Sequence, residues 1–569
     1  MKKIDAHEMK LRKYLQISEG TLHIPFSQRP YEWEKDQVKR LFNDLTGLYD
    51  LEEEIHMLNF FTISSEGEDK IFDGQQRTIT ILLLVLIFIK KIEKFNMSEA
   101  GLQFQEKYLV EKDHSTVPPS EERKIVFSDK EIDSLFYEII SNRNKSEYEF
   151  QDYDNPSQKS IVRNYNLLNN LLTEFIEERN MKYGDILKLF NTILDNTILI
   201  VIRTATDNLA RAMFETLNNT GKKLESFYVL KNDLVISLTE EKVQDNWRQI
   251  ESNLEGYDPS HFLLAFSTIL SGRHTKQKAL SKIYDSYDRD SNESMQKLLM
   301  SLVLASKNYL YIKNPSQLKN PKEKEQVIQY KRLSQQIEIF EVTQHVPLIL
   351  AMFMKNRSLI EINKTLSHIL NLIIRRFYFN EERANVIESD IAELARRTFN
   401  DNLKLTTIIE NIKKMSIDDE DLELAIKRKE IDSWQSKKRF KFILKEIYNL
   451  FDLNNEVQIK DSLDEIEYEH ILPQRPKSNS KWLEKFNDDN KRKRYTGKVG
   501  NGTLLVKRWN IKATNKDFDL KKDDYLKSHV PENKKIAEKK DWGMDEIDNR
   551  TKDLSAKIIE YLDFIISSN

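Results

Sequence analysis

Near the C-terminal end, one histidine and two asparagines stand at spacings that suit a hydrolytic site. His470 follows Glu469 in the segment YEHILPQ, Asn501 lies in GNGTLL, and Asn510 follows it in WNIKATN. A neutral imidazole can take a proton from an attacking water, and carboxylate and amide oxygens bind hard cations such as Mg²⁺. We therefore expect His470 to act as a general base, with Glu469 and Asn510 as metal ligands. Asn501 would orient the imidazole or brace the loop, and the alternative is that His470 is a structural histidine.

Basic residues interleaved with aromatic ones surround this constellation. Such a pattern is typical of a track that contacts nucleic-acid phosphates, and a solvated lysine-rich loop is the alternative. The basic residues predicted to bind DNA are Lys491, Arg492, Lys493, Arg494, Lys498, Lys507 and Arg508, with Tyr495 and Trp509 between them.

A second group of polar residues lies near the N-terminus, in the segment IPFSQRPYEW at residues 24–33. Gln28 is an amide with two kinds of hydrogen-bonding atom, and Arg29 is a rigid guanidinium that suits phosphate. Tyr31 and Trp33 are flat side chains on which a base could stack. The segment therefore predicts a nucleotide contact, and the alternative is a surface turn anchored by its aromatic residues.

The segment FDGQQR at residues 72–77 predicts a strand, a glycine turn and the start of a helix. Free backbone N–H groups at a helix start can face an anion. We expect this turn to bind a nucleotide, and the alternative is a capped helix start with solvent-facing glutamines. The residues predicted to contact the nucleotide are Gly74, Gln75, Gln76 and Arg77, together with Asp73, which could also hold a metal ion or orient a water.

A third N-terminal segment, residues 213–235, predicts a helix that ends near Gly221. Asn218 lies at its polar tip and is a candidate for nucleotide contact. A plain helix–turn–helix corner is the alternative for this segment.

The elements that must position these residues can be predicted from hydrophobic periodicity. Glycine is scarce, at 13 of 569 residues, so glycines within short polar motifs indicate close backbone approach. Predicted strands cover residues 21–25, 60–64, 70–72, 196–203, 466–471 and 502–506, and predicted helices cover 36–45 and 76–91. Residues 60–64 and 70–72 are expected to form a hairpin.

Length and composition limit the class of protein. A chain of 569 residues is too long for one core, and we expect three domains at 1–238, 239–450 and 451–569, the middle one a helical scaffold. The absence of cysteine excludes disulfides, thiolate metal sites and a cysteine nucleophile, and favours a cytoplasmic address. The longest apolar run, residues 81–89, is too short to span a bilayer, so no membrane partner is expected. The net charge of −3 excludes a global attraction to nucleic acid.

The order of these motifs resembles that of GmrSD-type modification-dependent restriction enzymes and of the SspE-type defence effector. IPxxQRPYxW, DGQQR and FETLNxxG stand here at residues 24–33, 73–77 and 214–221, as in nucleotidase domains related to ParB and sulfiredoxin. EHILPQ, GN and a downstream Asn look like a His-Me finger (HNH-like) nuclease domain. This sequence has Asn510 where the generic pattern has a last histidine ligand, and Gly502 where an apolar residue usually follows GN.

The resemblance implies an α+β, multidomain, helix-rich fold. A mixed α/β nucleotidase domain would come first, then an all-helical middle and a ββα-metal nuclease domain. It implies an NTP-regulated, Mg²⁺- or Mn²⁺-dependent endonuclease with NTPase activity, using GTP or ATP and acting on phage DNA according to its modification. The rival hypothesis is a nucleotide-sensing DNA-binding or adaptor protein with an inactive nuclease-like domain. The oligomeric state stays open, a homo-oligomer included.

Overall fold

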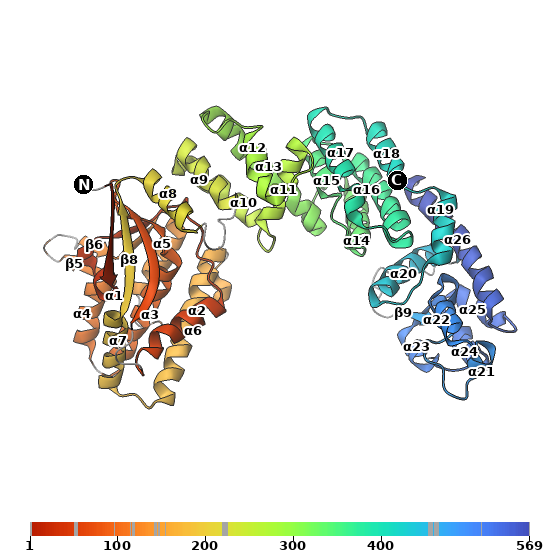
Figure 1. Ribbon diagram of the computed structural model, residues 1–569, viewed down its shortest axis with the longest axis horizontal. Coiled ribbons are helices and arrows are strands. Elements are labelled where there is room, and N and C mark those ends of the chain that lie inside the picture. The colour runs from red at the N-terminus through yellow and green to blue at the C-terminus, as the bar shows by residue number, and fades with distance from the viewer. Residues whose placement is uncertain are drawn as a thin grey trace. The chain divides into compact units, whose positions relative to one another are not determined.

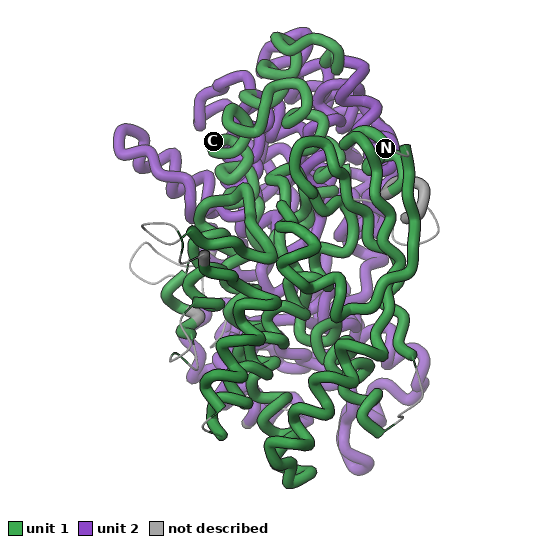
Figure 2. The backbone as a smooth tube through the Cα atoms, turned by 90° about the vertical axis from the view of Figure 1, so that its left-hand side faces the viewer, with its two compact units in different colours: residues 1–260, 287–300 green, residues 261–286, 301–569 purple. Residues whose placement is uncertain are grey.

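The structure, a computed structural model, divides into two compact units (Figure 2). Unit 1 contains residues 1–260 and 287–300, and unit 2 contains residues 261–286 and 301–569. Each unit is described by itself. The described residues are 3–50, 55–95, 97–113, 115, 120–141, 145, 148–153, 155–218, 226–452, 459, 466–513 and 515–567.

Unit 1 is built on a six-stranded mixed sheet with the order β1-β8-β3-β4-β2-β7 (Figure 1). The adjacent strands β8 and β3 run parallel, whereas β1 is antiparallel to β8 and β4 is antiparallel to β3. The short strand β2 is parallel to both β4 and β7. The strands are β1 Ile4–Lys10, β2 Leu22–Ile24, β3 His56–Ser64, β4 Lys70–Asp73, β7 Ile125–Phe127 and β8 Thr197–Thr204.

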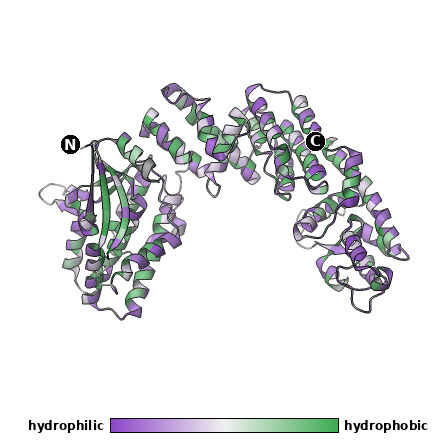
Figure 3. Ribbon diagram, in the orientation of Figure 1, coloured by the Kyte–Doolittle hydropathy of each residue, from purple (hydrophilic) through white to green (hydrophobic). Residues whose placement is uncertain are grey.

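The core of unit 1 includes helix α3, Gln75–Glu93, which is apolar around its whole circumference. Every residue from Thr78 to Ile89 is buried, because α3 lies among helices α4, α6 and α7. A helix that is apolar on all sides is stable only when it is enclosed in this way. In Figure 3 the strands of the sheet show both hydrophobic and hydrophilic colouring, and apolar residues of β8 are among the buried ones. The other helices that pack in unit 1 are α1 Leu11–Tyr14, α2 Lys35–Gly47, α4 Ser98–Tyr108, α5 Lys130–Ser141, α6 Pro156–Glu178 and α7 Tyr183–Asn196.

Three helices follow strand β8 in unit 1. They are α8 Asp207–Asn218, α9 Ser226–Leu238 and α10 Glu240–Asn253. Helix α10 packs against α9 and buries Val243, Trp247 and Ile250 at helical spacing. A separate two-stranded sheet pairs β5 Val110–Asp113 with β6 Ser120–Arg123.

The chain from α11 to α20 is helical. Pairs such as α14 and α16, or α15 and α17, pack against each other through apolar faces. The helices are α11 Pro259–Ser271, α12 Ala279–Tyr284, α13 Asn292–Lys313, α14 Lys324–Glu338, α15 Val346–Met354, α16 Leu359–Leu372, α17 Glu388–Asn400, α18 Leu405–Lys414, α19 Asp419–Arg428 and α20 Trp434–Ile447.

A small ββα arrangement closes unit 2. Strands β9, Ile466–His470, and β10, Gly502–Val506, pair in antiparallel register, and helix α23, Lys507–Ala513, packs against both. Their core includes Leu472, Trp482, Leu505 and Trp542. The surrounding helices are α21 Lys481–Lys485, α22 Asp489–Gly497, α24 Phe518–Leu526, α25 Pro531–Glu538 and α26 Met544–Ser567.

The predicted fold class is confirmed: the chain is α+β, multidomain and rich in helix. The predicted hairpin is the antiparallel pair β3–β4, and the predicted strand at 502–506 is β10. The division into domains at 238 and 450 stays a prediction. Among the described helices, none is long and apolar enough to cross a membrane.

Candidate functional site

His470 is the last residue of strand β9 and lies opposite Gly502 of β10. Because α23 packs on both strands, the structure brings together the three segments that carry His470, Asn501 and Asn510. Gly502 has no room for a side chain, since a Cβ there would lie 2.2 Å from the hydroxyl oxygen of Tyr468. The apolar residue that usually follows GN would not fit here without movement of that ring.

The His470 imidazole is enclosed by neighbouring side chains. It donates a hydrogen bond to the backbone carbonyl of Ile431, and its centroid lies 4.9 Å from that of the Tyr468 ring. Its Nε2 is buried and has no hydrogen-bond partner among the described residues, so the bond to Ile431 uses Nδ1. Burial, reinforced by the nearby charge of Lys437, lowers the pKa of His470 to about 3. The ring is therefore neutral at physiological pH, with Nε2 as its unprotonated nitrogen.

Glu469 precedes His470 on the same strand, so the two side chains leave opposite faces. The Glu469 carboxylate is buried and accepts hydrogen bonds from Lys521 Nζ at 2.5 Å and Tyr525 Oη at 3.1 Å. Lys521 also donates to the His470 carbonyl at 2.7 Å. Burial raises the pKa of Glu469 and lowers that of Lys521, and their mutual attraction opposes both shifts. This carboxylate is already neutralised by an internal partner.

The amide group of Asn501 is fully occupied by hydrogen bonds. Its Oδ1 accepts from Leu472 N at 2.7 Å and from Trp542 Nε1 at 3.3 Å. Its Nδ2 donates to the carbonyls of Leu472 at 3.0 Å and Thr496 at 2.9 Å. Of the two roles expected for Asn501, these contacts match bracing the loop.

The residues expected to hold a cation are not assembled as a metal site in this arrangement. Asn510 is half-buried on α23 and makes no side-chain hydrogen bond with the described residues, whereas Glu469 faces Lys521. Within the described part of the chain, no group of three or more His, Asp or Glu residues could hold a metal ion. Glu469 would have to leave Lys521 before it could bind Mg²⁺. Magnesium dependence stays a prediction, and no step is derived through the metal.

The predicted DNA-binding residues divide into exposed and paired ones. Arg492 forms an ion pair with Asp489 at 2.7 Å, and Lys498 pairs with Asp548. The remaining five side chains are exposed on α22 and at the start of α23, where they can meet phosphates. They are Lys491, Lys493, Arg494, Lys507 and Arg508.

In unit 1, the DGQQR turn has the expected strand–glycine–helix geometry. Gly74 has a φ of 91°, and a Cβ on it would lie 2.2 Å from the Phe61 ring. Asp73 accepts a hydrogen bond from Gly74 N at 2.7 Å and lies 3.5 Å from Arg77. Burial raises the pKa of Asp73, and the charges of Arg77 and Arg29 oppose the shift. The glycine is required by backbone conformation and by close packing.

The side chains after Gly74 hold neighbouring backbone in place. Gln75 Nε2 donates to the Arg29 carbonyl, and Gln76 Nε2 donates to the Pro30 carbonyl, each at 2.8 Å. Arg77 donates to the carbonyl of Leu58 and, at 2.9 Å, to that of Phe60. These donors fix the segment at residues 24–33 and the strand β3 rather than extending into solvent.

Tyr31 and Trp33, the predicted stacking residues of the segment at 24–33, also have internal partners. Tyr31 is buried, and its hydroxyl bonds with Thr80 Oγ1 at 2.7 Å and accepts from Asn164 Nδ2 at 3.1 Å. Trp33 is half-buried against the core, and its carbonyl accepts from Asn164 Nδ2 at 2.7 Å. Trp33 does not line the pocket described next.

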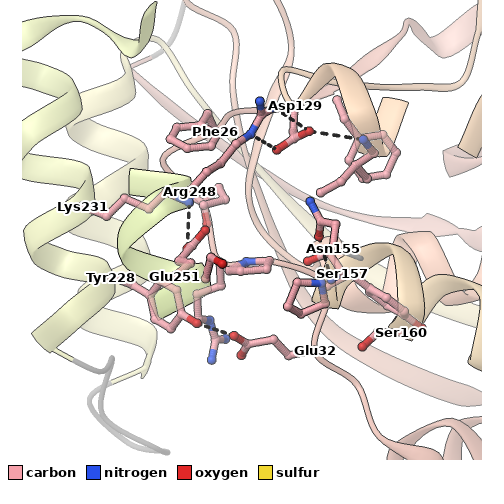
Figure 4. Close-up of a pocket in the computed structure, with 18 of the residues that line it drawn as sticks. Phe26, Glu32, Asp129, Asn155, Ser157, Ser160, Tyr228, Lys231, Arg248 and Glu251 are labelled. Carbon is pink, nitrogen blue, oxygen red and sulfur yellow. Dashed lines mark hydrogen bonds and ion pairs between the residues drawn. The ribbon is translucent and has the colours of Figure 1, made fainter. Parts of the chain in front are cut away.

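A pocket of about 640 Å³ opens beside this segment, within unit 1 (Figure 4). Of the predicted nucleotide-binding residues, Gln28, Arg29, Tyr31 and Gln75 line it. Arg29 is exposed there and is the only predicted residue that brings a positive charge to its wall. The predicted residues outside its lining are Trp33, Asp73, Gly74, Gln76 and Arg77. Asn218 ends α8, and its side chain lies outside the described residues, as do residues 219–221.

Sequence reasoning missed the opposite wall of the pocket, which α9 and α10 provide. Arg248 pairs with Asp129 at 2.9 Å, and Lys231 with Glu251 at 3.4 Å (Figure 4). Tyr228 of α9 donates to Glu32 of the segment at 24–33. In total three basic and five acidic side chains line the pocket. The sequence offered one indication of this wall, namely polar residues such as Lys231 among the apolar residues of a helix.

Comparison with protein families gives two matches. Residues 11–235 match the family model described as GmrSD restriction endonuclease, N-terminal domain. Residues 416–557 match the model described as GmrSD restriction endonucleases, C-terminal domain. The first range includes the DGQQR turn, and the second includes the ββα arrangement with His470. No curated protein matches the chain in sequence.

Proposed function

Since the chain belongs to the GmrSD restriction endonuclease family, we propose that it is an NTP-regulated, Mg²⁺-dependent endonuclease that nicks or cleaves phage DNA according to its modification. The family supports a restriction endonuclease of the defence type with DNA as substrate. The nucleotide, the cation and the dependence on modification are parts of our proposal.

The observation that carries the proposal is the unprotonated His470 Nε2 at the end of β9. In phosphodiester hydrolysis a water oxygen forms a bond to phosphorus, and the bond from phosphorus to a sugar oxygen breaks. His470 Nε2 would take the proton of the attacking water and later release it to solvent, and the leaving sugar oxygen would take a proton from solvent. The Ile431 carbonyl holds the ring in the tautomer that this step needs. Because Nε2 is buried, the side chains around the ring must move when DNA binds so that water can reach this atom.

The proposed regulatory nucleotide would bind in the pocket of unit 1. A volume of about 640 Å³ lies within the ~300–1,000 Å³ typical of small-molecule pockets. Arg29 would contact the phosphates, and the aromatic rings of Phe26 and Tyr228 would face the base. Because acidic side chains outnumber basic ones on the lining, a triphosphate would bind most readily as its Mg²⁺ complex.

A second candidate function is supported by the ion pair between Glu469 and Lys521. A nuclease-like domain whose acidic residue is neutralised internally would bind DNA without cutting it. The chain would then be a nucleotide-sensing DNA-binding or adaptor protein.

Nicking assays separate these functions. Purified full-length protein would be incubated with matched plasmids that differ only in modification, with Mg²⁺ or Mn²⁺ and with GTP, ATP or neither. Conversion of supercoiled plasmid to nicked or linear DNA supports the endonuclease. Salt-sensitive binding to DNA without nicking under every condition supports the adaptor.

A further inference from the structure

Trp434 is the most exposed large hydrophobic side chain in the described part of the chain, at 73%. It is the first residue of α20, whose start is fixed because Ser433 Oγ accepts from Ser436 N at 3.1 Å. The ammonium of Lys438 lies 5.4 Å from the centroid of the indole. A wide aromatic surface is therefore held open on a rigid helix end, with a cation beside it.

The surface around Trp434 carries an excess of positive charge. Lys437 and Lys438 lie on the first turns of α20, and Asp432 is the nearest acid before them in the chain. Lys437 Nζ donates to Gln474 Oε1 at 3.4 Å, which ties α20 to the loop that follows His470. That loop adds two exposed cations, Arg475 and Lys477.

One hydrogen bond and one nearby charge connect this surface to the imidazole of His470. The ring donates to the carbonyl of Ile431, three residues before Trp434. The charge of Lys437, one turn after Trp434, acts on the same ring. The residues on both sides of Trp434 in the chain therefore lie near the His470 ring.

We propose that Trp434, Lys437 and Lys438 form a platform for the DNA strand that is cut at His470. An unstacked base beside the target phosphate stacks on the indole, and the two lysines contact the flanking phosphates. Tryptophan suits this role because every base has a flat face, and the positive charge around the ring complements the phosphates. This inference rests on the proposed endonuclease function.

The test measures DNA binding by the full chain with His470→Ala, so that cutting does not interfere. The probe is a fluorescein-labelled duplex interrupted by a short single-stranded gap, followed by anisotropy. Loss of one stacked base weakens binding by about 5- to 150-fold, so we expect a loss in that range for Trp434→Ala and a smaller one for Trp434→Phe. For Lys438→Gln, a plot of the logarithm of the binding constant against the logarithm of the salt concentration is expected to be less steep, by just under one unit of slope.

Matched controls are Ile328→Ala, an apolar side chain 67% exposed on α14, and Lys307→Gln, an exposed lysine on α13. Neither is expected to change binding. Equal binding by Trp434→Ala and its parent would overturn the inference, as would an equal loss in Ile328→Ala. A change in sedimentation of Trp434→Ala without DNA would assign the ring to a protein interface and overturn it too.

The same variants distinguish failure of the inference from failure of the function. If the chain with His470 intact nicks plasmid while Trp434→Ala binds DNA like its parent, only the platform is wrong. If the chain with His470 intact neither binds nor nicks any DNA, the proposed function fails and the platform with it.

Discussion

The side chain of Asn501 binds the backbone of Leu472 from both sides, although 29 residues separate them in sequence. Its carbonyl oxygen accepts from Leu472 N, and its amide nitrogen donates to Leu472 O. Leu472 lies two residues after His470. Between them, the backbone N–H of Ile471 donates to the backbone carbonyl of Asn501 at 2.9 Å. The direction in which the chain leaves β9, and with it the position of the imidazole, depends on this one asparagine.

Replacement of Asn501 is expected to destabilise the end of unit 2 and to abolish nicking. Asn501→Ala leaves the buried N–H and C=O of Leu472 without partners, at a cost of about 2–4 kcal/mol. Asn501→Asp keeps the acceptor for Leu472 N but puts carboxylate oxygens against two carbonyls, so it should be no better tolerated. Thermal unfolding of both variants beside Asn479→Ala, an exposed asparagine, checks this. Wild-type unfolding temperatures in both would contradict it.

Gly74→Ala is expected to destabilise unit 1 much more than Gly67→Ala. Both glycines have positive φ, 91° and 77°, so each alanine costs about 1 kcal/mol for backbone conformation. At Gly74 the added Cβ would also meet the Phe61 ring, whereas nothing lies within 4 Å at Gly67. Chemical denaturation measures the difference, which should exceed about 1 kcal/mol. Equal losses of unfolding free energy in the two variants would contradict a steric clash between the added Cβ and Phe61.

Arg29 and Arg77 belong to neighbouring motifs but are expected to have separable effects. Arg29→Ala removes an exposed charge from the pocket, so nucleotide affinity should fall about tenfold or more while stability is unchanged. Arg77→Ala removes two hydrogen bonds to β3 and should cost about 2–3 kcal/mol of stability. Titration calorimetry with GTP and ATP, together with thermal unfolding, separates these effects. Arg40→Ala, an exposed arginine of α2, is the control. Unchanged affinity in Arg29→Ala would remove Arg29 from the nucleotide site.

Stability is expected to decline as the pH falls, in part through His345, a half-buried histidine whose Nδ1 atom is buried. Burial, with a smaller effect of the Lys313 charge, lowers its pKa to about 4, against about 6.5 in the unfolded chain. Between pH 4 and pH 6.5 the unfolded chain therefore binds more protons than the folded one. The contribution of His345 to the free energy of unfolding is fully present above pH 6.5 and declines as the pH falls toward 4. This residue contributes a loss of about 2 kcal/mol between pH 7 and pH 5. His345→Gln should flatten the pH dependence of unfolding, and the exposed His529→Gln should not. Parallel curves for wild type and His345→Gln would contradict this.

Much of the fold could be predicted from the sequence because periodicity is a local signal. The strand predicted at 196–203 is β8 at 197–204, and the helix predicted at 76–91 is α3 at 75–93. The edge strand β1 was not predicted, since its pairing with β8 joins segments almost 200 residues apart. The positions of Arg248 and Lys231 in the pocket wall depend on helix packing, which periodicity does not specify.

The predicted site residues differ in how far their type indicates their role. Gly74 behaves as its motif suggests, because a positive φ can be inferred from a glycine turn. Gln75 and Gln76 are amides that could bind a ligand, but nearby carbonyls take their N–H groups instead. Glu469, predicted as a metal ligand, points away from His470 because successive residues of a strand point to opposite faces. The partner that holds it, Lys521, could not be identified before β9 and α24 were placed together.

The most direct test of the central claim is plasmid nicking by the wild type and by His470→Ala in parallel, with Mg²⁺ and on DNA that the wild type cuts. Binding of DNA and of nucleotide by the variant is measured on the same preparations. We expect His470→Ala to lose nicking by at least 100-fold, the low end of what a general base contributes, while both kinds of binding are kept. Nicking at the wild-type rate by His470→Ala would contradict the account, because His470 is the residue proposed to take the proton of the attacking water.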